Sequence, residues 1–219
     1  MKASRPKNNR QKSSSGTIEK LPPIFTPVFR VHYPYVFEMA RFQRNDGTED
    51  THYSVTMIFD GSTDITLLKK FIFQHIKKRW PDKGSRPQIT NPLKSGNAEQ
   101  KYLEFEAYKN AMFARAKTQR RIGVVDRDNL PITDPSEIYS GCVCRALIDA
   151  YTYDKAGNRG VGLGLLALQK LADGKRIGGV DAVEAFSSAP KLNNAELPDD
   201  IEEYSDSYEE DFENEEIPF

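Results

Sequence analysis

Apolar and polar residues alternate in two segments of the first quarter of the chain, and both predict β-strands. Over residues 27–37 the odd positions are apolar or aromatic, which predicts one face made of Phe29, Val31, Tyr33, Tyr35 and Phe37. Pro34 interrupts this strand and predicts an edge, a bend or a bulge, because proline has no backbone donor. Over residues 51–59 the alternation predicts a half-buried strand with inward Tyr53, Val55, Met57 and Phe59.

The apolar spacing then becomes helical. Between residues 64 and 80 apolar side chains recur every three or four positions, at Ile65, Leu68, Phe71, Ile72, His75 and Ile76. Asp64 is the predicted N-cap, and Pro81 ends the pattern. Lys77, Lys78 and Arg79 complement the dipole at the end of this helix.

The clearest local signal is a hairpin in the second half of the chain. Residues 138–153 alternate, with a small apolar face made of Cys142, Cys144, Ala146, Ile148 and Ala150. The opposite face carries Arg145, Asp149, Tyr151 and Tyr153. Residues 154–158 form a tight turn containing Gly157, and residues 161–171 form the second strand.

The pattern between these elements is ambiguous. Residues 87–100 contain Asn-Pro and Ser-Gly steps and are predicted to be a loop. The Ala, Glu, Lys and Gln content of residues 98–118 favours a helix. Alternation over residues 108–117 also allows a strand with Lys109, Phe113, Arg115 and Lys117 on one face. Several strands with turn punctuation and one or two helices predict a mainly β barrel or sandwich.

Charge divides the chain into a basic body and an acidic tail. The formal net charge is −1, but residues 192–219 carry 12 Asp and Glu and no Lys or Arg. Residues 1–191 therefore carry a net charge of +11. We expect a disordered basic arm over residues 1–20, a folded domain over 21–186 and a disordered acidic tail over 187–219. This division predicts nucleic-acid binding by the body and partner binding or regulation by the tail, with a merely solubilising tail as the alternative.

Cysteine and hydropathy narrow the class further. Cys142 and Cys144 are the only cysteines and predict two small buried thiols in a reducing compartment. Zinc is the less favoured alternative, because His32, His52 and His75 are scattered and offer no second ligand pair. The sequence predicts no metal and no cofactor. It also has neither an apolar segment of about 20 residues nor the apolar segment of a secretion signal, so we expect no membrane association.

The C-terminal tip carries a family resemblance. It consists of acidic residues followed by an apolar end, namely Glu213, Glu215, Glu216, Ile217, Pro218 and Phe219. This tip is similar to the end of bacterial single-stranded DNA-binding proteins and to the acidic, Phe-terminated tails of T7-type phage single-stranded DNA-binding proteins. By that resemblance the tail docks a DNA polymerase, helicase or primase.

Motifs in the body extend the resemblance over residues 25–185. They include Gly123-Val-Val-Asp126, Asn158-Arg-Gly-Val161 and Gly164-Leu-Leu-Ala-Leu-Gln-Lys170. These resemble a phage family related to the T7-type proteins. The resemblance implies an OB-fold, a five-stranded Greek-key barrel, that binds single-stranded DNA without sequence preference and has no catalytic activity. It also implies a role in DNA replication, recombination and repair in the cytoplasm of an infected bacterial host, and it favours the strand over residues 108–117. Cys142-Val-Cys144 and the Glu-rich tip depart from the family pattern.

Binding a single strand without reading its sequence requires cations for the phosphates and rings for the bases. The candidate DNA-contacting residues combine both: Lys94, Lys109, Phe113, Arg115, Lys117, Arg120, Arg121, Arg145, Tyr151, Tyr153, Lys155 and Arg159. Phe113 has a core position as its alternative. Conversely, Phe29, Tyr33 and Phe37 are expected in the core, with DNA contact as their alternative. The tail carboxylates resemble a phosphate backbone, so we hypothesise that the tail covers this groove until DNA binds. Pairing of body and tail between two subunits of a homodimer is the competing hypothesis.

Rival functions find weaker support. Gly160-Val-Gly162-Leu-Gly164 lacks the Gly-Lys-Ser/Thr of a phosphate loop and falls in a strand pattern. Asp126 and Asp128 allow a metal-dependent nuclease, but Asp-Arg-Asp-Asn is more typical of a turn. An RNA chaperone, or a replisome interaction protein that uses its acidic tail, remains the alternative, because preference for DNA over RNA depends on 2′-OH contacts that a sequence does not reveal.

Overall fold

The computed structural model describes residues 21–43, 47–84, 87–98, 100–155, 157–179, 182–187 and 189–190. The chain divides into two compact units, residues 1–179 and 180–219. Within the second unit, residues Ala182–Ser187 form the short helix α2. The predicted basic arm and nearly all of the predicted acidic tail, including its tip, lie outside the described residues.

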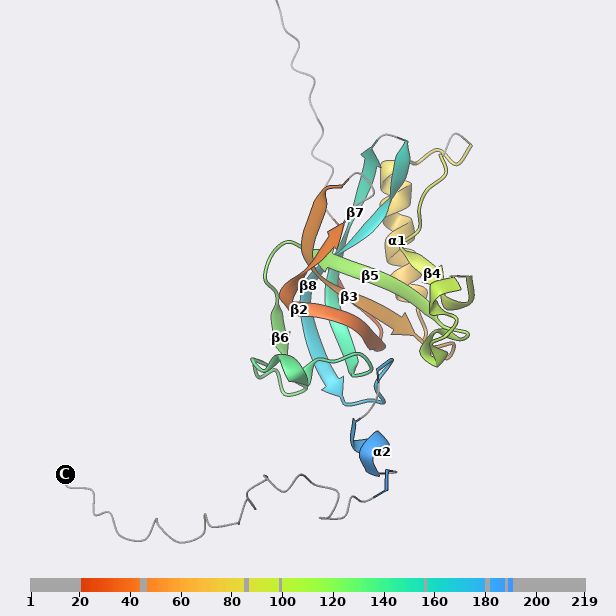
Figure 1. The fold of residues 1–219 in the computed structure, drawn as a ribbon. Coiled ribbons are helices and arrows are strands. Elements are labelled where there is room, and N and C mark those ends of the chain that lie inside the picture. Colours follow the sequence, from red (N-terminus) through yellow and green to blue (C-terminus); the bar gives the residue numbers. More distant parts are fainter. Residues whose placement is uncertain are drawn as a thin grey trace, which may run out of the picture. The chain divides into compact units, whose positions relative to one another are not determined.

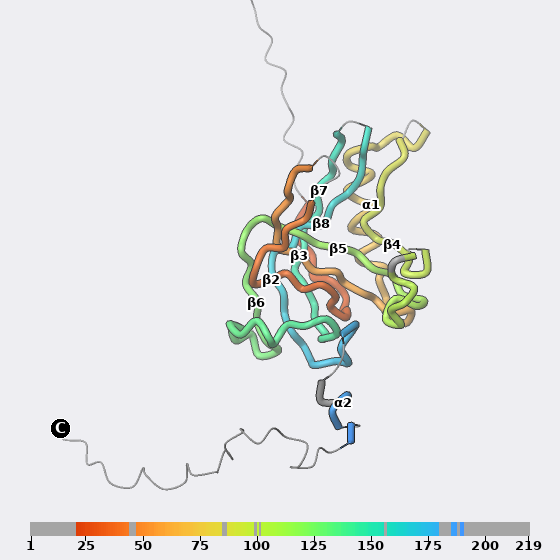
Figure 2. The backbone as a smooth tube through the Cα atoms, in the orientation of Figure 1, coloured from red at the N-terminus to blue at the C-terminus, as the bar shows by residue number. Residues whose placement is uncertain are grey.

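The first unit is a β-barrel (Figures 1 and 2). Its strands are β2 (Phe29–Gln43), β3 (Glu49–Phe59), β5 (Met112–Thr118), β7 (Val143–Lys155) and β8 (Asn158–Ala172). β2 pairs with β3, β3 with β5, β5 with β8, β8 with β7, and β7 with β2, so the pairing returns to its starting strand. The β5–β8 pair is parallel and the other four are antiparallel. The prediction of a mainly β, OB-like fold is confirmed.

Short elements extend the barrel. β1 (Ile24–Phe25) pairs with β7, β4 (Leu93–Ser95) with β5, and β6 (Gly123–Val125) with β8. Within the described residues, four single 3₁₀ turns lie in the connections: η1 (Gly96–Ala98), η2 (Gln100–Tyr102), η3 (Glu106–Tyr108) and η4 (Pro135–Glu137). The predicted loop over residues 87–100 is therefore correct only in part, since it contains β4 and η1.

The helix α1 (Thr66–Arg79) follows the predicted stripe. Leu68, Phe71, Ile72 and His75 are buried against the barrel. The predicted N-cap is displaced by one residue, because Ile65 occupies that position. Asp64 still satisfies a free helix donor, since its Oδ1 accepts from the Thr66 N–H at 2.9 Å, and hydrogen bonds from the Thr66 side chain and N–H lower the pKa of Asp64.

The predicted face of β2 is broken at Tyr33. The pairing of β2 with β3 shifts register between His32 and Tyr35, and Tyr33 has a φ of 49°. The bulge predicted at Pro34 is thus confirmed, but Tyr33 and Tyr35 do not share the buried face of Phe29 and Val31. An extra residue in one strand reverses the alternation beyond it, so a constant period across the bulge gave the wrong face.

Both faces of β3 are covered over most of its length, so the prediction of a half-buried strand is wrong. Val55, Met57 and Phe59 lie in the main core, as predicted. On the opposite face His52, Ser54, Thr56 and Ile58 are also buried. Ile58 belongs to a second apolar cluster with Tyr108, Ala111, Phe113 and Ile177. This cluster comes from segments far away in sequence, which alternation within one strand cannot reveal.

Residues 98–118 resolve the ambiguous pattern. The strand that the resemblance favours is confirmed over Met112–Thr118, where η2 and η3 lead into β5, and the helical alternative is wrong. Lys109 precedes this strand, so its predicted place on the strand face is also wrong. β3 lies along the whole of β5, from Phe59–Met112 to Tyr53–Thr118. Backbone hydrogen bonds to a neighbouring strand outweigh the small helical propensity of these residues.

The predicted hairpin is confirmed, with altered ends. Lys155 pairs with Asn158 at the tip, and β8 starts at Asn158 rather than at 161. β7 starts at Val143 rather than at 138, because η4 and a turn occupy the preceding residues. Cys142 and Cys144 are buried free thiols, as predicted, with their sulfur atoms 3.7 Å apart. Within the described residues, no group of three or more His, Cys, Asp or Glu could hold a metal ion.

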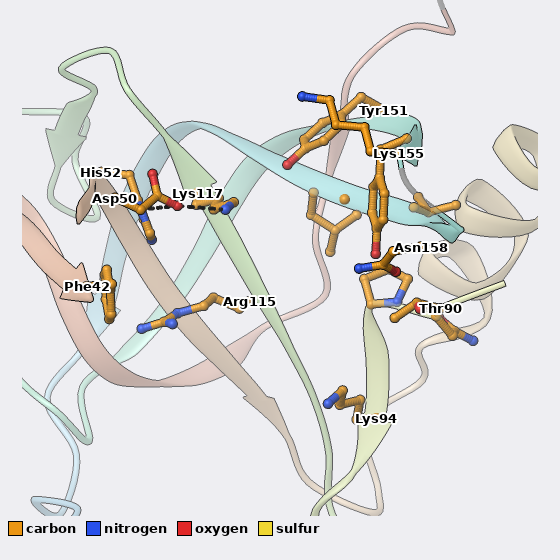
Figure 3. Close-up of a pocket in the computed structure, with 16 residues that line it drawn as sticks. Phe42, Asp50, His52, Thr90, Lys94, Arg115, Lys117, Tyr151, Lys155 and Asn158 are labelled. Carbon is orange, nitrogen blue, oxygen red and sulfur yellow. Dashed lines mark ion pairs between the residues drawn. The ribbon is translucent and has the colours of Figure 1, made fainter. Parts of the chain in front are cut away.

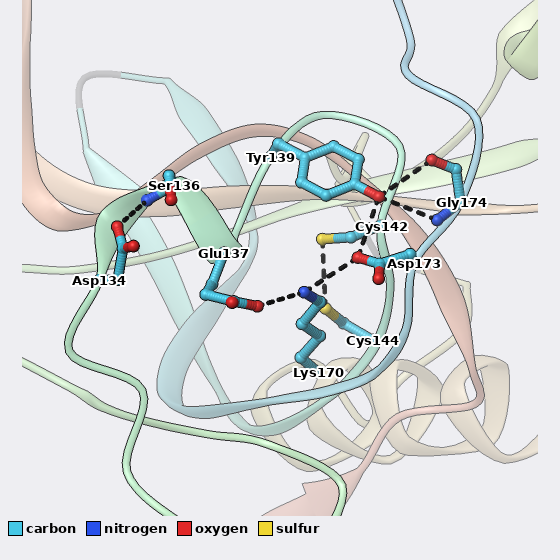
Figure 4. A network of polar contacts seen from close by, with 9 residues as sticks. All are labelled: Asp134, Ser136, Glu137, Tyr139, Cys142, Cys144, Lys170, Asp173 and Gly174. Atoms are coloured by element: carbon cyan, nitrogen blue, oxygen red, sulfur yellow. Dashed lines mark hydrogen bonds and ion pairs between the residues drawn. The ribbon is translucent and has the colours of Figure 1, made fainter. Parts of the chain in front are cut away.

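A polar network joins this turn to the end of β8 (Figure 4). Lys170 pairs with Glu137 and with Asp173, the latter at 2.9 Å. The Tyr139 hydroxyl donates to Asp173 Oδ1 at 3.1 Å and accepts from the Gly174 N–H at 3.1 Å. These contacts fasten the segment around η4 against β8. No helix in the described part of the chain is long and apolar enough to cross a membrane.

Replacing Tyr139 with phenylalanine should lower stability without changing nucleic-acid binding. The variant loses the hydrogen bonds that this hydroxyl makes with Asp173 and with the Gly174 backbone, and one net hydrogen bond is worth about 0.5–1.5 kcal/mol. Urea unfolding should show a lower midpoint with an unchanged slope. Tyr35→Phe is the matched control, since it removes a hydroxyl from a more exposed ring. Equal midpoints for Tyr139→Phe and the parent chain would show that this network does not stabilise the barrel.

Candidate nucleic-acid interface

A groove of about 670 Å³ opens on the outside of the barrel (Figure 3). One wall is formed where β2 ends and β3 begins, with Phe42, Asp50 and His52. The opposite wall is the β7–β8 hairpin, with Tyr151, Tyr153, Lys155 and Asn158. Between them lie Arg115 and Lys117 of β5 and Lys94 of β4. This is the region of an OB barrel, between its first and last hairpins, where oligonucleotides bind in other OB-folds.

The floor of the groove is cationic because of the alternation along β5. Ala114 and Ala116 point into the core and are fully buried, so Arg115 and Lys117 point outward and are exposed. Lys117 Nζ lies 3.6 Å from Asp50 Oδ2, which holds this ammonium group near the β3 wall. Arg115 lies with its guanidinium 4.6 Å from the centre of the Phe42 ring. Both cations are thus held in place yet accessible to a phosphate.

A stacked pair of rings forms the β3 wall. The Phe42 and His52 rings lie 4.6 Å apart with an interplanar angle of 15°. His52 is buried, and burial followed by the charge of Lys117 lowers its pKa. Among the described residues neither ring nitrogen has a hydrogen-bond partner, and Nδ1 lies 3.6 Å from Asp50 Oδ2. The imidazole thus stacks on Phe42, and the Arg115 guanidinium lies over the same Phe42 ring.

In the opposite wall, two tyrosine side chains pack against glycines of the neighbouring strand. In the β7–β8 ladder Tyr151 lies opposite Gly162, and Tyr153 lies opposite Gly160. A Cβ at Gly162 would collide with the Tyr151 ring, and one at Gly160 would collide with the Tyr153 hydroxyl. The glycines thus let both rings lie close along β8. Tyr151 is 44% exposed, while partial burial raises the pKa of its hydroxyl.

The segment before β4 is pinned to the same hairpin. The Thr90 N–H donates to the Arg159 carbonyl at 2.8 Å, and the Val161 N–H donates to the Thr90 carbonyl at 3.2 Å. Asn91 Oδ1 accepts from the Leu93 N–H at 3.0 Å and orders the turn into β4. These bonds fix the side of the groove on which the exposed Lys94 lies.

The structure brings together half of the candidate residues in this groove. They are Lys94, Arg115, Lys117, Tyr151, Tyr153 and Lys155. Arg120 lines a neighbouring hollow that shares Lys117 and Tyr151. Five candidates line neither of these hollows: Lys109, Phe113, Arg121, Arg145 and Arg159.

Each displaced candidate has a reason in the packing. Phe113 is 6% exposed in the second apolar cluster, so its ring is not presented to a base. Arg145 bonds Gln169 Oε1 at 2.6 Å and lies over the Phe25 ring, away from the hairpin tip. Arg159 is held by Asp154 at 2.9 Å. Lys109 follows η3, and Arg121 lies beyond the end of β5.

Phe42, Asp50 and His52 were missed by the sequence analysis. The first predicted strand ended at residue 37, whereas β2 continues to Gln43, where Phe42 pairs with Asp50. The available signal was Arg41-Phe42-Gln43, an aromatic residue between polar ones just before Asn45-Asp46-Gly47. The candidate partner-docking residues of the tail lie outside the described residues.

The acidic pair considered for a nuclease lies in a turn, as the sequence favoured. Asp126 Oδ1 accepts from the N–H groups of Asp128 and Leu130 at 2.9 and 2.8 Å. The same carboxylate oxygen is thus engaged by the backbone of its own turn. The Gly160–Gly164 stretch lies within β8, which agrees with its strand pattern.

Comparisons with known proteins point to one family. The family model described as the single-stranded DNA-binding protein of Enterobacter phage Enc34 matches residues 23–200. Protein p50 of Acyrthosiphon pisum secondary endosymbiont phage 1 is 33% identical over 97 residues, which cover 43% of this chain and 52% of that protein. The chain thus spans about half the length of this curated relative.

Solved structures share the fold. The single-stranded DNA-binding protein of bacteriophage Enc34, solved in complex with single-stranded DNA, aligns with a TM-score of 0.58 at 18% identity. That alignment covers 72% of this chain and 90% of the phage protein. Gp2.5, a single-stranded DNA-binding protein of bacteriophage T7, aligns with a TM-score of 0.51 at 11% identity and covers 78% and 96% of the two chains.

Proposed function

Because the chain belongs to the family of the Enterobacter phage Enc34 single-stranded DNA-binding protein, we propose that it binds single-stranded DNA in the groove of Figure 3. The observation that carries the proposal is the order of side chains across this groove. A ring wall at Phe42, a cationic floor at Arg115 and Lys117, and a second ring wall at Tyr151 follow one another. Rings stack on bases of any identity, and cations bind phosphates of any sequence. Binding is therefore tolerant of sequence.

We further propose how this activity is used. The protein covers and protects single strands during phage DNA replication, recombination and repair, in the cytoplasm of an infected bacterial host. Its acidic tail, ending at Phe219, recruits a DNA polymerase, helicase or primase. No catalytic step belongs to this function. The support for the tail's role is the charge of residues 192–219 and the apolar Ile-Pro-Phe end.

The tail and DNA compete for the groove in this proposal. A tethered segment acts at an effective concentration of about 1 mM, so a tail affinity of about 0.1 mM reduces DNA affinity about tenfold. A chain that ends at Lys191 lacks all 12 tail carboxylates and should bind fluorescent oligo-dT about tenfold more tightly at low salt. Titrations over a salt series, with a matched duplex beside the single strand, measure this change.

The outcomes separate the parts of the proposal. Deleting only Phe219 should leave oligo-dT affinity unchanged and weaken recruitment of replication enzymes. Equal affinity of the full chain and the shortened chain would leave DNA binding in place and contradict competition by the tail. A dimer formed only by the full chain would assign the tail to a second subunit. No preference for single strand over duplex would overturn the function itself.

A further inference from the structure

A second hollow, of about 390 Å³, lies elsewhere on the barrel surface. It is lined by His32 and Tyr33 of β2, by Phe105, by Ser140, and by Arg176 to Gly179 after β8. None of these residues lines the groove described above. Its lining combines aromatic rings with an exposed arginine, which is the same chemistry as the groove.

Tyr33 is held in an unusual conformation at this hollow. Its φ of 49° is rare for a large side chain and costs conformational energy. Its ring lies 3.8 Å from the His32 ring with an interplanar angle of 23°, and its N–H donates to Ser140 Oγ at 3.2 Å. The ring is nevertheless 39% exposed. The bulge therefore stacks the partly exposed Tyr33 on the buried His32 ring.

The lower ring of this stack is rigidly supported. His32 Nδ1 lies 2.7 Å from the Tyr108 hydroxyl in a buried hydrogen bond. Burial lowers the pKa of His32 to about 4, so the imidazole is neutral at physiological pH. Phe105 packs edge-on to His32 at 5.1 Å. A neutral, buried and hydrogen-bonded imidazole is suited to support a stacking ring rather than to bind an anion.

One cation, Arg176, lines the hollow beside the stacked rings. The Arg176 guanidinium lies 4.4 Å from the centre of the Tyr139 ring, which holds it at the edge of the hollow. Arg30 Nη2 donates to the Lys175 carbonyl and fastens this segment to β2. Arg176 and Lys175 are both exposed. A phosphate beside a base at Tyr33 would meet Arg176.

Neighbouring strands connect the second hollow to the groove. His32 of β2 pairs with Thr56 of β3, which pairs with Arg115 of β5. Adjacent strands are about 4.8 Å apart, so this row of three strands spans about 10 Å. Tyr35 adds an exposed ring on the same strand as Tyr33, and it packs edge-on to Phe42 at 6.1 Å. A surface of rings and cations therefore leads from Phe42 and Arg115 toward Tyr33.

We propose that the hollow at Tyr33 is a second base-binding subsite, which receives a base of the same DNA strand that occupies the groove. The base stacks on the exposed face of Tyr33, and Arg176 binds an adjacent phosphate. The inference rests on the proposed function, because the groove holds the rest of the strand. It makes binding depend on the length of the DNA strand. Short strands fill the groove alone, and longer strands reach Tyr33 as well.

A length series of oligo-dT tests the subsite. OB-folds occupy about 4–16 nucleotides, so fluorescent oligo-dT probes should cover that range. Tyr33→Asn removes the ring and keeps a residue that tolerates positive φ. We expect it to leave the shortest bound probes unaffected and to weaken the longest about tenfold, with a smaller occluded site. Tyr33→Phe should retain the affinity of the parent chain for every length.

A cross-link gives a second readout that does not depend on a variant folding. Oligo-dT with photoreactive halogenated uracil should cross-link to Tyr33 in the parent chain, as mapped by mass spectrometry, when the strand is long and not when it is short. In the length series, Leu166→Ala is the control for surface truncation, because it shortens an exposed side chain on β8 that lines neither the groove nor the hollow at Tyr33.

Three results would overturn the subsite. An unchanged affinity of Tyr33→Asn for long probes would show that no base stacks there. An equal loss for all lengths would show that Tyr33 only supports the groove. A parent chain that binds no oligo-dT of any length would overturn the proposed function and the subsite together, which distinguishes that failure from the first two.

Discussion

Replacing Arg115 and Lys117 together with glutamine is expected to weaken oligo-dT binding about 25-fold at about 0.1 M salt. Each phosphate contact on a single strand contributes about 0.7 to the slope of log affinity against log salt, so two contacts contribute about 1.4. Both side chains are exposed on β5, opposite the buried Ala114 and Ala116. The double variant therefore leaves the core side of the strand unchanged. Its loss of affinity should decrease as salt rises and disappear at about 1 M salt, which is one decade above ~0.1 M.

A matched change of charge elsewhere is the control. Lys69→Gln with Lys70→Gln removes two exposed cations from α1, outside the groove lining. Its salt slope should stay close to that of the parent chain. Arg115→Lys loses the planar group that lies 4.6 Å from the centre of the Phe42 ring, so its affinity should fall below that of the parent chain. Because lysine keeps the charge, Arg115→Lys should lose less affinity than Arg115→Gln. Equal slopes for both double variants would place the DNA somewhere other than the β5 floor.

Tyr151→Leu is expected to weaken oligo-dT binding by about 1–3 kcal/mol, or about 5- to 150-fold, with the salt slope unchanged. Leucine still covers part of Gly162 but cannot stack on a base. Tyr151→Phe keeps the ring and should retain most of the affinity. A smaller slope of log affinity against log salt for Tyr151→Leu would contradict this explanation. It would show that the substitution displaces the cations of the hairpin instead of removing only one stacking contact.

Gly162→Ala tests the same wall from the β8 side. The new Cβ would collide with the outer end of the Tyr151 ring, which can swing away, rather than with backbone. Affinity should fall because the ring no longer lies along the groove. The double variant Tyr151→Leu/Gly162→Ala should be no weaker than Tyr151→Leu alone, because both changes act on one ring. Additive losses would contradict the idea that Gly162 serves to position Tyr151.

The spacing of apolar residues predicted correctly those elements in which one face lies against the core along its whole length. The even face of β7 is an example: Cys144, Ala146, Ile148 and Ala150 are small, apolar and buried as predicted. The Lys155–Asn158 turn followed from short-range turn chemistry. The stripe of α1 followed from the helical period for the same reason.

The candidate groove could be predicted in part. Arg115, Lys117, Tyr151 and Tyr153 were found because cations and rings alternate on their strands. Phe113 follows the same alternation as Arg115, yet it is buried beneath η3 and the segment after β8. The sequence around Phe42 and around His52 gave little indication of a binding site. The two rings form a stacked pair only when the end of β2 lies beside the start of β3. Alternation tells which side chains share a face, but not what covers that face.

The sequence by itself determined the charge division, the hairpin, the helix and the family resemblance, because each depends on residues close together in the chain or on composition. Tertiary structure decided three things: the outward direction of Tyr33 at the predicted bulge, the strand over residues 112–118 where local pattern left a helix open, and the stacking of Phe42 on His52. Each of these requires a partner from a distant segment, which supplies hydrogen bonds or apolar cover that outweighs local preference. The groove itself is of this second kind, since its walls come from opposite ends of the barrel sequence and meet only when β5 pairs with both β3 and β8.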